Sequence, residues 1–204
     1  MVAAFQRVSP SRMDVIRRIA AAIAAVALAA PAAAQAPVQE RTYPITGGTG
    51  LELYRSIAEK APNGGGHVAQ TSFKLTWKRL FDERGGDCFL VHAKPVLSIT
   101  QTFPKPGKLD DDMRRRWEKF AAGMRQHEDQ HVRMIEEMVK TTEASLVGMS
   151  VKDDRTCAKV KRAVSARIDE GYQAHRQRSR AFDKAEMGFG GRMFVMLEDL
   201  VNER

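Results

Sequence analysis

Cysteine is scarce in this sequence, which has only Cys88 and Cys157 among its 204 residues. The two do not form a Cys-x-x-Cys motif, which argues against a thiol redox centre and against a cysteine-type zinc knuckle. Internal repeats and low-complexity segments are also lacking after residue 34. Hydrophobic residues make up 43% of the chain and charged residues 28%, as in an ordinary globular protein. We therefore expect one folded domain.

Long apolar runs are absent beyond residue 34, so we expect no permanent membrane span there. The first 34 residues differ: four arginines precede an apolar run over residues 19–30, and the small residues of Pro31–Ala34 follow. This three-part pattern is typical of a secretory signal peptide, which we predict over residues 1–34 with cleavage after Ala34. The alternative is an N-terminal membrane anchor, and the start codon stands at Met1 or Met13. The domain then covers residues 35–204 of a periplasmic or secreted protein.

Aromatic residues interleaved with basic ones are also missing, and no nucleic-acid reader motif is present. The formal net charge is +8, and it falls to about +5 without residues 1–34. This mild excess does not predict a nucleic-acid partner. It suits attraction to anionic envelope surfaces or to acidic substrates. The sequence gives no indication of the oligomeric state.

The even number of cysteines predicts a disulfide in an exported chain, because its compartment is oxidising. A bond between Cys88 and Cys157 would close a loop of about 70 residues and stabilise the fold by about 4 kcal/mol in the chain-entropy model. The alternative is two separate thiols.

Alternating apolar and polar residues predict two strands, around residues 73–78 and 89–100. Gly85 and Gly86 lie in the link between them, so we expect a hairpin. Pro95 indicates that the second strand lies at an edge or carries a bulge there. A short strand is also expected at 41–46, and the run from Phe103 should end the β region.

Helical spacing predicts a helix over residues 51–60 and a long helix from Asp110 to about Leu146. A further helix should begin near Asp153 or Asp154 and reach about Phe182, and a short one should follow at 193–201. The expected fold class is α+β, with a short antiparallel hairpin packed on the long helix and on a second, C-terminal helix.

The long helix carries the run His127-Glu128-Asp129-Gln130-His131, which has the form H-E-x-x-H. Two histidines four residues apart share one helical face and can bind one zinc ion. A glutamate beside the first histidine can act as a general base toward zinc-bound water. Glu128 and His131 also continue an inward apolar stripe formed by Trp117, Ala121, Met124, Ile135 and Met138. The alternative is a helix with surface histidines and an ordinary carboxylate.

Several further segments carry a family resemblance across residues Thr42 to Gly191. They are Tyr43–Gly47, Thr76-Trp77, Cys88, Phe103-Pro104, Trp117–Phe120, His127–Val132 and Cys157. Together they resemble the predicted secreted zinc-dependent proteases grouped as domain of unknown function 922. The resemblance implies a zincin-like α+β fold, a Zn²⁺ cofactor and metallopeptidase chemistry, but no particular substrate.

The chain departs from that family at the segment Phe182–Phe189, where the family has Tyr-Asp-x-x-Thr-x-His-Gly. Asp183 matches, whereas Glu186 replaces the Thr and Gly188 replaces the His. If that His is the third zinc ligand of the family, this chain has lost it. We favour Asp183 as the third ligand because it matches the motif, and Glu186 is the alternative.

The remaining histidines give weaker indications. His175 lies among three arginines, which disfavours a metal, and we expect it at the surface. We expect His92 to face solvent on a strand, and His67 carries no motif.

The leading hypothesis is a zinc metallopeptidase in which Glu128 is the general base and a peptide or protein is the substrate, held by an edge strand. The second hypothesis is a non-enzymatic envelope binding or scaffold protein with an incomplete or structural metal site. A third is metal-assisted hydrolysis of another bond, such as a cell-wall amide.

Overall fold

The computed structural model describes residues 37–62 and 67–202. Their fold is α+β, as the sequence predicts: four helices accompany a mixed sheet of four strands. The signal peptide expected over residues 1–34 lies outside the described residues and stays a prediction. The elements are, in order, β1 (Val38–Ile45), α2 (Gly50–Lys60), β2 (Gln70–Arg84), β3 (Asp87–Pro106), α3 (Asp111–Leu146), β4 (Ser150–Val151), α4 (Ala158–Met187) and α5 (Arg192–Val201).

The hairpin of β2 and β3 dominates the sheet. Its turn is Gly85–Gly86, where both φ values are positive (63° and 94°), as a two-residue type I′ turn requires. The hairpin is longer than predicted, because β3 continues through Phe103 to Pro106. There β1 pairs with it in parallel, which gives the sheet the order β1-β3-β2. The sequence could not show this pairing, because the partners lie about 60 residues apart.

Pro95 lies where β3 is locally an edge strand, as predicted. It pairs with Trp77 of β2 on one side. On the other side, β4 reaches only as far as Phe89 and β1 begins only at Ile99, so within residues 37–62 and 67–202 no strand pairs with β3 at Pro95. A proline costs no ladder hydrogen bond at such a place.

The ends of the long helices follow from local capping. Asp110 accepts a hydrogen bond from the Met113 backbone N–H at 2.8 Å, which begins α3 as expected. Helix α4 begins later than predicted, because Cys157 takes a left-handed conformation (φ 60°) just before it. It also continues past Phe182 to Met187, since the first glycine after that point is Gly188. Asp183 therefore lies on a helix.

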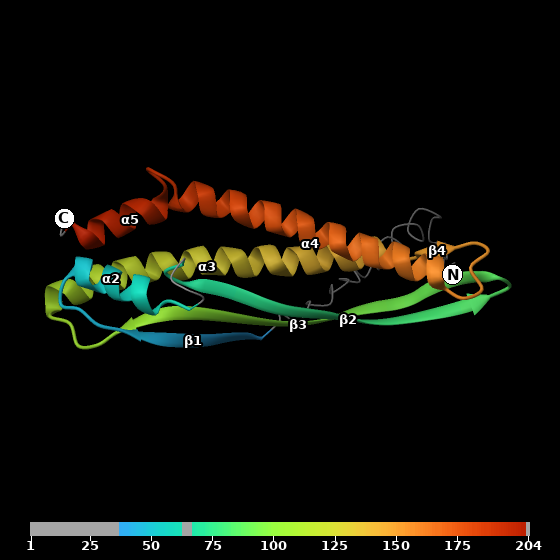
Figure 1. Ribbon diagram of the computed structural model, residues 1–204, viewed down its shortest axis with the longest axis horizontal. Helices are drawn as coiled ribbons and strands as arrows, with labels where there is room; N and C mark the ends of the chain where they lie inside the picture. Colours follow the sequence, from blue (N-terminus) through green and yellow to red (C-terminus); the bar gives the residue numbers. More distant parts are fainter. Residues whose placement is uncertain (1–36, 63–66, 203–204) are drawn as a thin grey trace, which may run out of the picture. The chain divides into compact units, whose positions relative to one another are not determined.

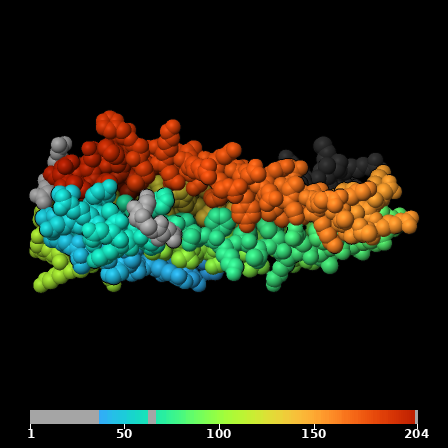
Figure 2. Space-filling model, viewed as in Figure 1, coloured from blue at the N-terminus to red at the C-terminus, as the bar shows by residue number. Residues whose placement is uncertain are grey.

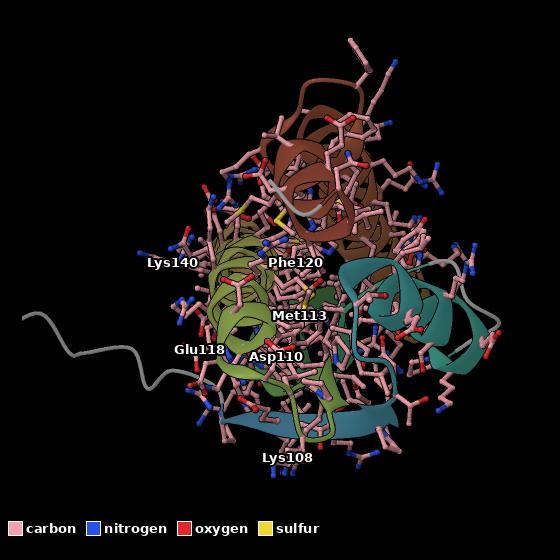
Figure 3. The ribbon with its side chains drawn as sticks, turned by 90° about the vertical axis from the view of Figure 1, so that its left-hand side faces the viewer. Lys108, Asp110, Met113, Glu118, Phe120 and Lys140 are labelled. Carbon is pink, nitrogen blue, oxygen red and sulfur yellow. A yellow bond between two sulfur atoms is a disulfide. The ribbon has the colours of Figure 1, made fainter. Side chains whose placement is uncertain are left out.

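The helices lie on one side of the sheet, where α3 runs along it and α4 packs on α3 (Figure 1). Helix α4 also contacts β2, through Tyr172 on Phe73. A view onto one end shows Met113 and Phe120 of α3 pointing inward, whereas Glu118 and Lys140 point away (Figure 3). One apolar cluster joins β1, α2, the start of α3 and α5. A second joins the middle of α3 to the sheet, and a third joins the hairpin end to α4.

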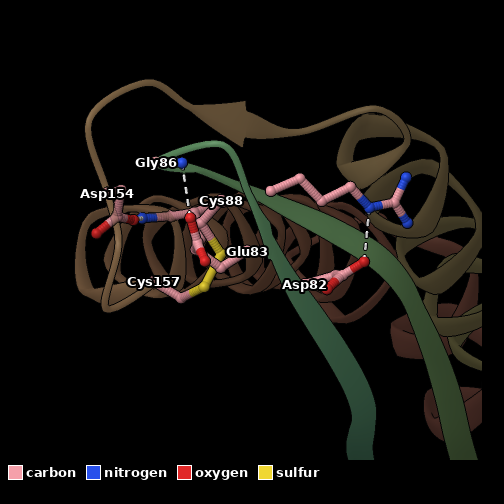
Figure 4. Close-up of a disulfide and its surroundings, with 8 residues drawn as sticks. Asp82, Glu83, Gly86, Cys88, Asp154 and Cys157 are labelled. Atoms are coloured by element: carbon pink, nitrogen blue, oxygen red, sulfur yellow. Dashed lines mark hydrogen bonds and ion pairs between the residues drawn. A yellow bond between two sulfur atoms is a disulfide. The ribbon is translucent and has the colours of Figure 1, made fainter.

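A disulfide joins Cys88 of β3 to Cys157, just before α4, as expected (Figure 4). The two residues are 69 positions apart, and both are buried. The bond thus ties the hairpin end to the start of α4. Within residues 37–62 and 67–202, no helix combines the length and apolar character that crossing a membrane would need.

Candidate metal centre

The H-E-x-x-H run lies on the buried face of α3, in the phase that the sequence predicts. His127 is 7% exposed and Glu128 is 4% exposed. Apolar residues of the same stripe, Met124 and Ile135, flank the polar run and are buried. Buried imidazole and carboxylate groups need polar partners. We therefore expect polar side chains of other elements to contact this face of α3.

Helix α4 brings Asp183 to the two histidines. Its Oδ1 lies 2.9 Å from His131 Nε2 and 3.3 Å from His127 Nε2, and the two Nε2 atoms are 3.2 Å apart. Tetrahedral zinc, with bonds of about 2.0–2.1 Å, separates its ligands by about 3.3–3.4 Å. The three atoms therefore match the spacing of three ligands around one ion, with a fourth position left for another group.

The charges around the two histidines favour a positive charge between them. Burial alone would raise the pKa of Asp183, but hydrogen bonds from both histidines bring it well below the ordinary carboxyl value. Burial alone would lower the pKa of His131, but its hydrogen bond to Asp183 and the charges of Asp183 and Glu128 raise it above the ordinary imidazole value. A metal ion at this place would displace the proton that the raised pKa of His131 favours, because a histidine binds a metal in its neutral form.

Glu128 contacts the sheet. The Thr71 hydroxyl, on β2, donates a 2.6 Å hydrogen bond to Glu128 Oε2. The same hydroxyl lies 3.3 Å from the Glu128 backbone oxygen. The glutamate is thus anchored by one oxygen beside the two histidines.

The second nitrogen of each histidine faces a polar group from α4. His131 Nδ1 lies 3.1 Å from the Ser179 hydroxyl. His127 Nδ1 is buried without a hydrogen bond, 3.7 Å from Glu186 Oε2. Phe182 stacks on the His127 ring, with centroids 4.8 Å apart. Outer groups of this kind fix the orientation of histidines that bind a metal.

Glu186 is not part of the three-atom group. Its Oε2 accepts two hydrogen bonds from Arg192 of α5, at 2.6 and 2.9 Å, and lies on the Nδ1 side of His127. His175 is also outside the group. It is half-buried against Phe73, at 5.5 Å between ring centroids, and is less exposed than the sequence suggested. Burial, followed by the charges of His131 and Arg176, lowers its pKa.

The group opens into a cavity of about 470 Å³. Its walls come from α2, the start of β2, α3, α4 and α5, and they include His67 and Tyr54, which no motif indicated. His92, by contrast, is exposed on the hairpin, as predicted. Ser179 could have been found from its position four residues before Asp183 on the same helix, whereas Phe182, His67 and Tyr54 could not.

The fold and this group define an α+β protein with a His-His-Asp cluster that could hold a metal ion. The family model described as "Bacterial protein of unknown function (DUF922)" matches residues 40–191, so the chain belongs to that family. The resemblance drawn from the sequence motifs is thereby confirmed. Searches of curated proteins and of solved structures gave no match.

Proposed function

We propose that this protein is an exported, zincin-like metallopeptidase that depends on zinc. The observation that carries the proposal is the convergence of His127, His131 and Asp183 from two helices, beside the buried Glu128 and at a cavity. The disulfide, the bacterial family and the lack of a membrane-spanning helix in residues 37–62 and 67–202 are compatible with a periplasmic or extracellular location.

Two imidazoles and one carboxylate are an adequate ligand set for catalytic zinc. In this proposal His127 and His131 bind through Nε2 and Asp183 binds through Oδ1. Zinc bound there would activate water and polarise the carbonyl of a peptide. Ser179 orients the His131 ring through its contact with Nδ1, and Phe182 orients the His127 ring by stacking on it.

Glu128 performs the proton transfers. Thr71 occupies Oε2, so Oε1 is the oxygen that accepts a proton from the attacking water. The same oxygen then delivers the proton to the leaving amine nitrogen. Because Glu128 is buried, bulk water does not compete for the proton that its carboxylate accepts.

The outer edge of β2 supports a peptide as substrate. In the order β1-β3-β2, β2 has no further strand beside it among the described residues, and its first residues line the cavity. An extended peptide can add to such an edge through backbone hydrogen bonds, which places a peptide bond near Glu128.

Zinc content and peptide hydrolysis, measured together, test this function. The wild-type chain, purified without chelator, should hold about one zinc and cut a casein digest. Glu128→Gln should hold the same zinc and lose about 10²- to 10⁴-fold in hydrolysis rate. A variant that cuts as fast as the wild type would overturn the role of Glu128, and a wild type without zinc would overturn the proposal as a whole.

A second candidate is an envelope binding or scaffold protein with a structural zinc. Gly188 favours it, since that position holds a His in the segment that the family resemblance implies. The backbone there caps α4, and a Cβ would lie 2.5 Å from the Lys184 carbonyl oxygen. Zinc retention without cleavage of any peptide in a random library would favour this candidate. Cleavage of cell-wall amides in place of peptides would favour the third hypothesis.

A further inference from the structure

A second cavity, of about 620 Å³, lies between β2 and α4. We call it the basic groove, and its cationic side chains are Lys74, Arg176 and Arg180. Phe73 and Tyr172, which stack with centroids 6.1 Å apart, contribute apolar surface. In the space-filling view the surface of α4, in orange to red, lies directly beside the green surface of the hairpin (Figure 2).

The cations of the basic groove have no anionic partners. Among the described residues, none of Lys74, Arg176 and Arg180 forms an ion pair, and no carboxylate lines the groove. Arg178, in the same basic run of α4, instead pairs with Glu137 of α3. A cleft lined by charge of one sign concentrates ligands of the opposite sign, so the groove is suited to an anion.

The basic groove adjoins the candidate metal centre. Ser179 lines both cavities, and its hydroxyl contacts His131 Nδ1. Arg180 and Arg176 precede Asp183 on α4 by three and seven residues, or about 4.5 and 10.5 Å along the helix axis. An extended peptide advances about 3.3 Å per residue. The cations therefore lie about one to three residues from a peptide bond held at the metal centre.

We propose that the basic groove binds acidic side chains of the substrate, Asp or Glu, one to three residues from the bond that is cut. This inference rests on the proposed function and adds the substrate class. Guanidinium groups accept carboxylates through paired hydrogen bonds, and the apolar surface of Phe73 and Tyr172 accommodates the methylene stems. The outer edge of β2 holds the backbone of the same peptide.

Binding is measured on the full chain carrying Glu128→Gln and loaded with zinc, so that the probe is not consumed. The probe is a fluorescein-labelled decapeptide with a central Leu-Leu and Asp at two and three residues on each side. Its twin has Asn at the same four positions. Fluorescence anisotropy should show binding of the Asp peptide about tenfold tighter than that of its twin.

Arginine variants locate the effect. Arg176→Ala combined with Arg180→Ala should remove the preference for the Asp peptide while the weak binding of the Asn peptide remains. Arg178→Ala is the matched control, because it changes the charge of the same helix outside the groove and should keep the preference. Thermal melting of each variant shows that the chain is folded.

Three results would overturn the inference. Two of them are equal binding of the two peptides and loss of the preference in Arg178→Ala. The third is equally tight binding of an oligothymidylate of the same charge, which would indicate a general polyanion site. Failure of the proposed function is distinguishable, because it is read from zinc content and from cleavage by the chain with Glu128 intact. If the chain binds the Asp peptide in the groove but cuts neither peptide, the proposed peptidase activity is wrong. Binding of acidic side chains by the basic groove would still stand.

Discussion

The C-terminal end and the middle of α3 lie in different kinds of surroundings. Toward its C-terminus, Leu146 packs with Cys88, Val160 and Val164 in an apolar cluster, all at most 1% exposed, and the disulfide closes that cluster. Nearer its middle, the same buried stripe carries His127 and Glu128. The difference indicates that the hairpin end contributes stability, whereas the metal centre holds polar groups whose burial is costly without partners.

Removing the disulfide should have the largest effect on stability. The double variant Cys88→Ser with Cys157→Ser frees a loop whose ends are 69 residues apart. The free energy of unfolding should fall by about 4 kcal/mol in the chain-entropy model. Urea unfolding of the zinc-free chain measures this. Zinc affinity of the folded variant should stay unchanged, and its loss would show that the hairpin end and the metal centre are not independent.

Removing the charge of Glu186 beside His127 should affect only the metal centre. Glu186→Gln removes the charge that faces His127 Nδ1 and binds Arg192, so zinc affinity should fall about 10- to 100-fold. Competition with a chromogenic chelator gives the affinity. Glu198→Gln on α5 is the matched control, and an equal loss in both variants would point to a general charge effect.

Gly171 of α4 packs closely against Thr142 of α3, between the metal centre and the hairpin end. A Cβ added at Gly171 would lie 2.2 Å from Thr142 Oγ1. Gly171→Ala should therefore cost about 1–3 kcal/mol in urea unfolding. Thr142→Ala in the same chain should recover most of that loss. Gly123→Ala, whose added Cβ meets the flexible side chains of Met196 and Met193, should cost less, and a larger cost there would contradict the packing described.

The smallest expected effect concerns the start of α4. Asp154 accepts the Val160 N–H at 2.8 Å. Burial would raise the pKa of Asp154, but the backbone N–H groups of Val160, Lys159 and Ala158 lower it below its ordinary value. Its contribution to stability is therefore present above the ordinary carboxyl pKa and lost as the pH falls through the lowered one. Asp154→Asn should lower the melting temperature slightly at pH 7, and the difference should shrink below about pH 4.

Features with a local cause were predictable from the sequence. The bounds of α3, its inward stripe and the Gly85–Gly86 hairpin follow from periodicity, capping and turn chemistry. The extent of α4 to Met187 was missed although its cause is local, since the first glycine after Phe182 is Gly188. The parallel pairing of β1 with β3 was not predicted, because it depends on partners distant in sequence. For the same reason the cavity residues His67 and Tyr54, and the basic groove, appear only in three dimensions.

The sequence alone could not distinguish Asp183 from Glu186 as the third ligand. The family resemblance selected it over Glu186, although both lie on one face of α4. Only the structure shows that Asp183 reaches the Nε2 atoms while Glu186 pairs with Arg192. The distinction comes from the crossing of α3 with α4 and from α5, and neither can be read from one segment.

The metal content of the purified chain is the most direct test of the three-ligand site. Mass spectrometry of protein purified without chelator should find about one zinc per wild-type chain and much less in Asp183→Ala. Glu186→Ala should keep more zinc than Asp183→Ala. A wild-type chain without bound metal, or an Asp183→Ala chain with its full zinc, would contradict the three-ligand site on which the proposed function rests.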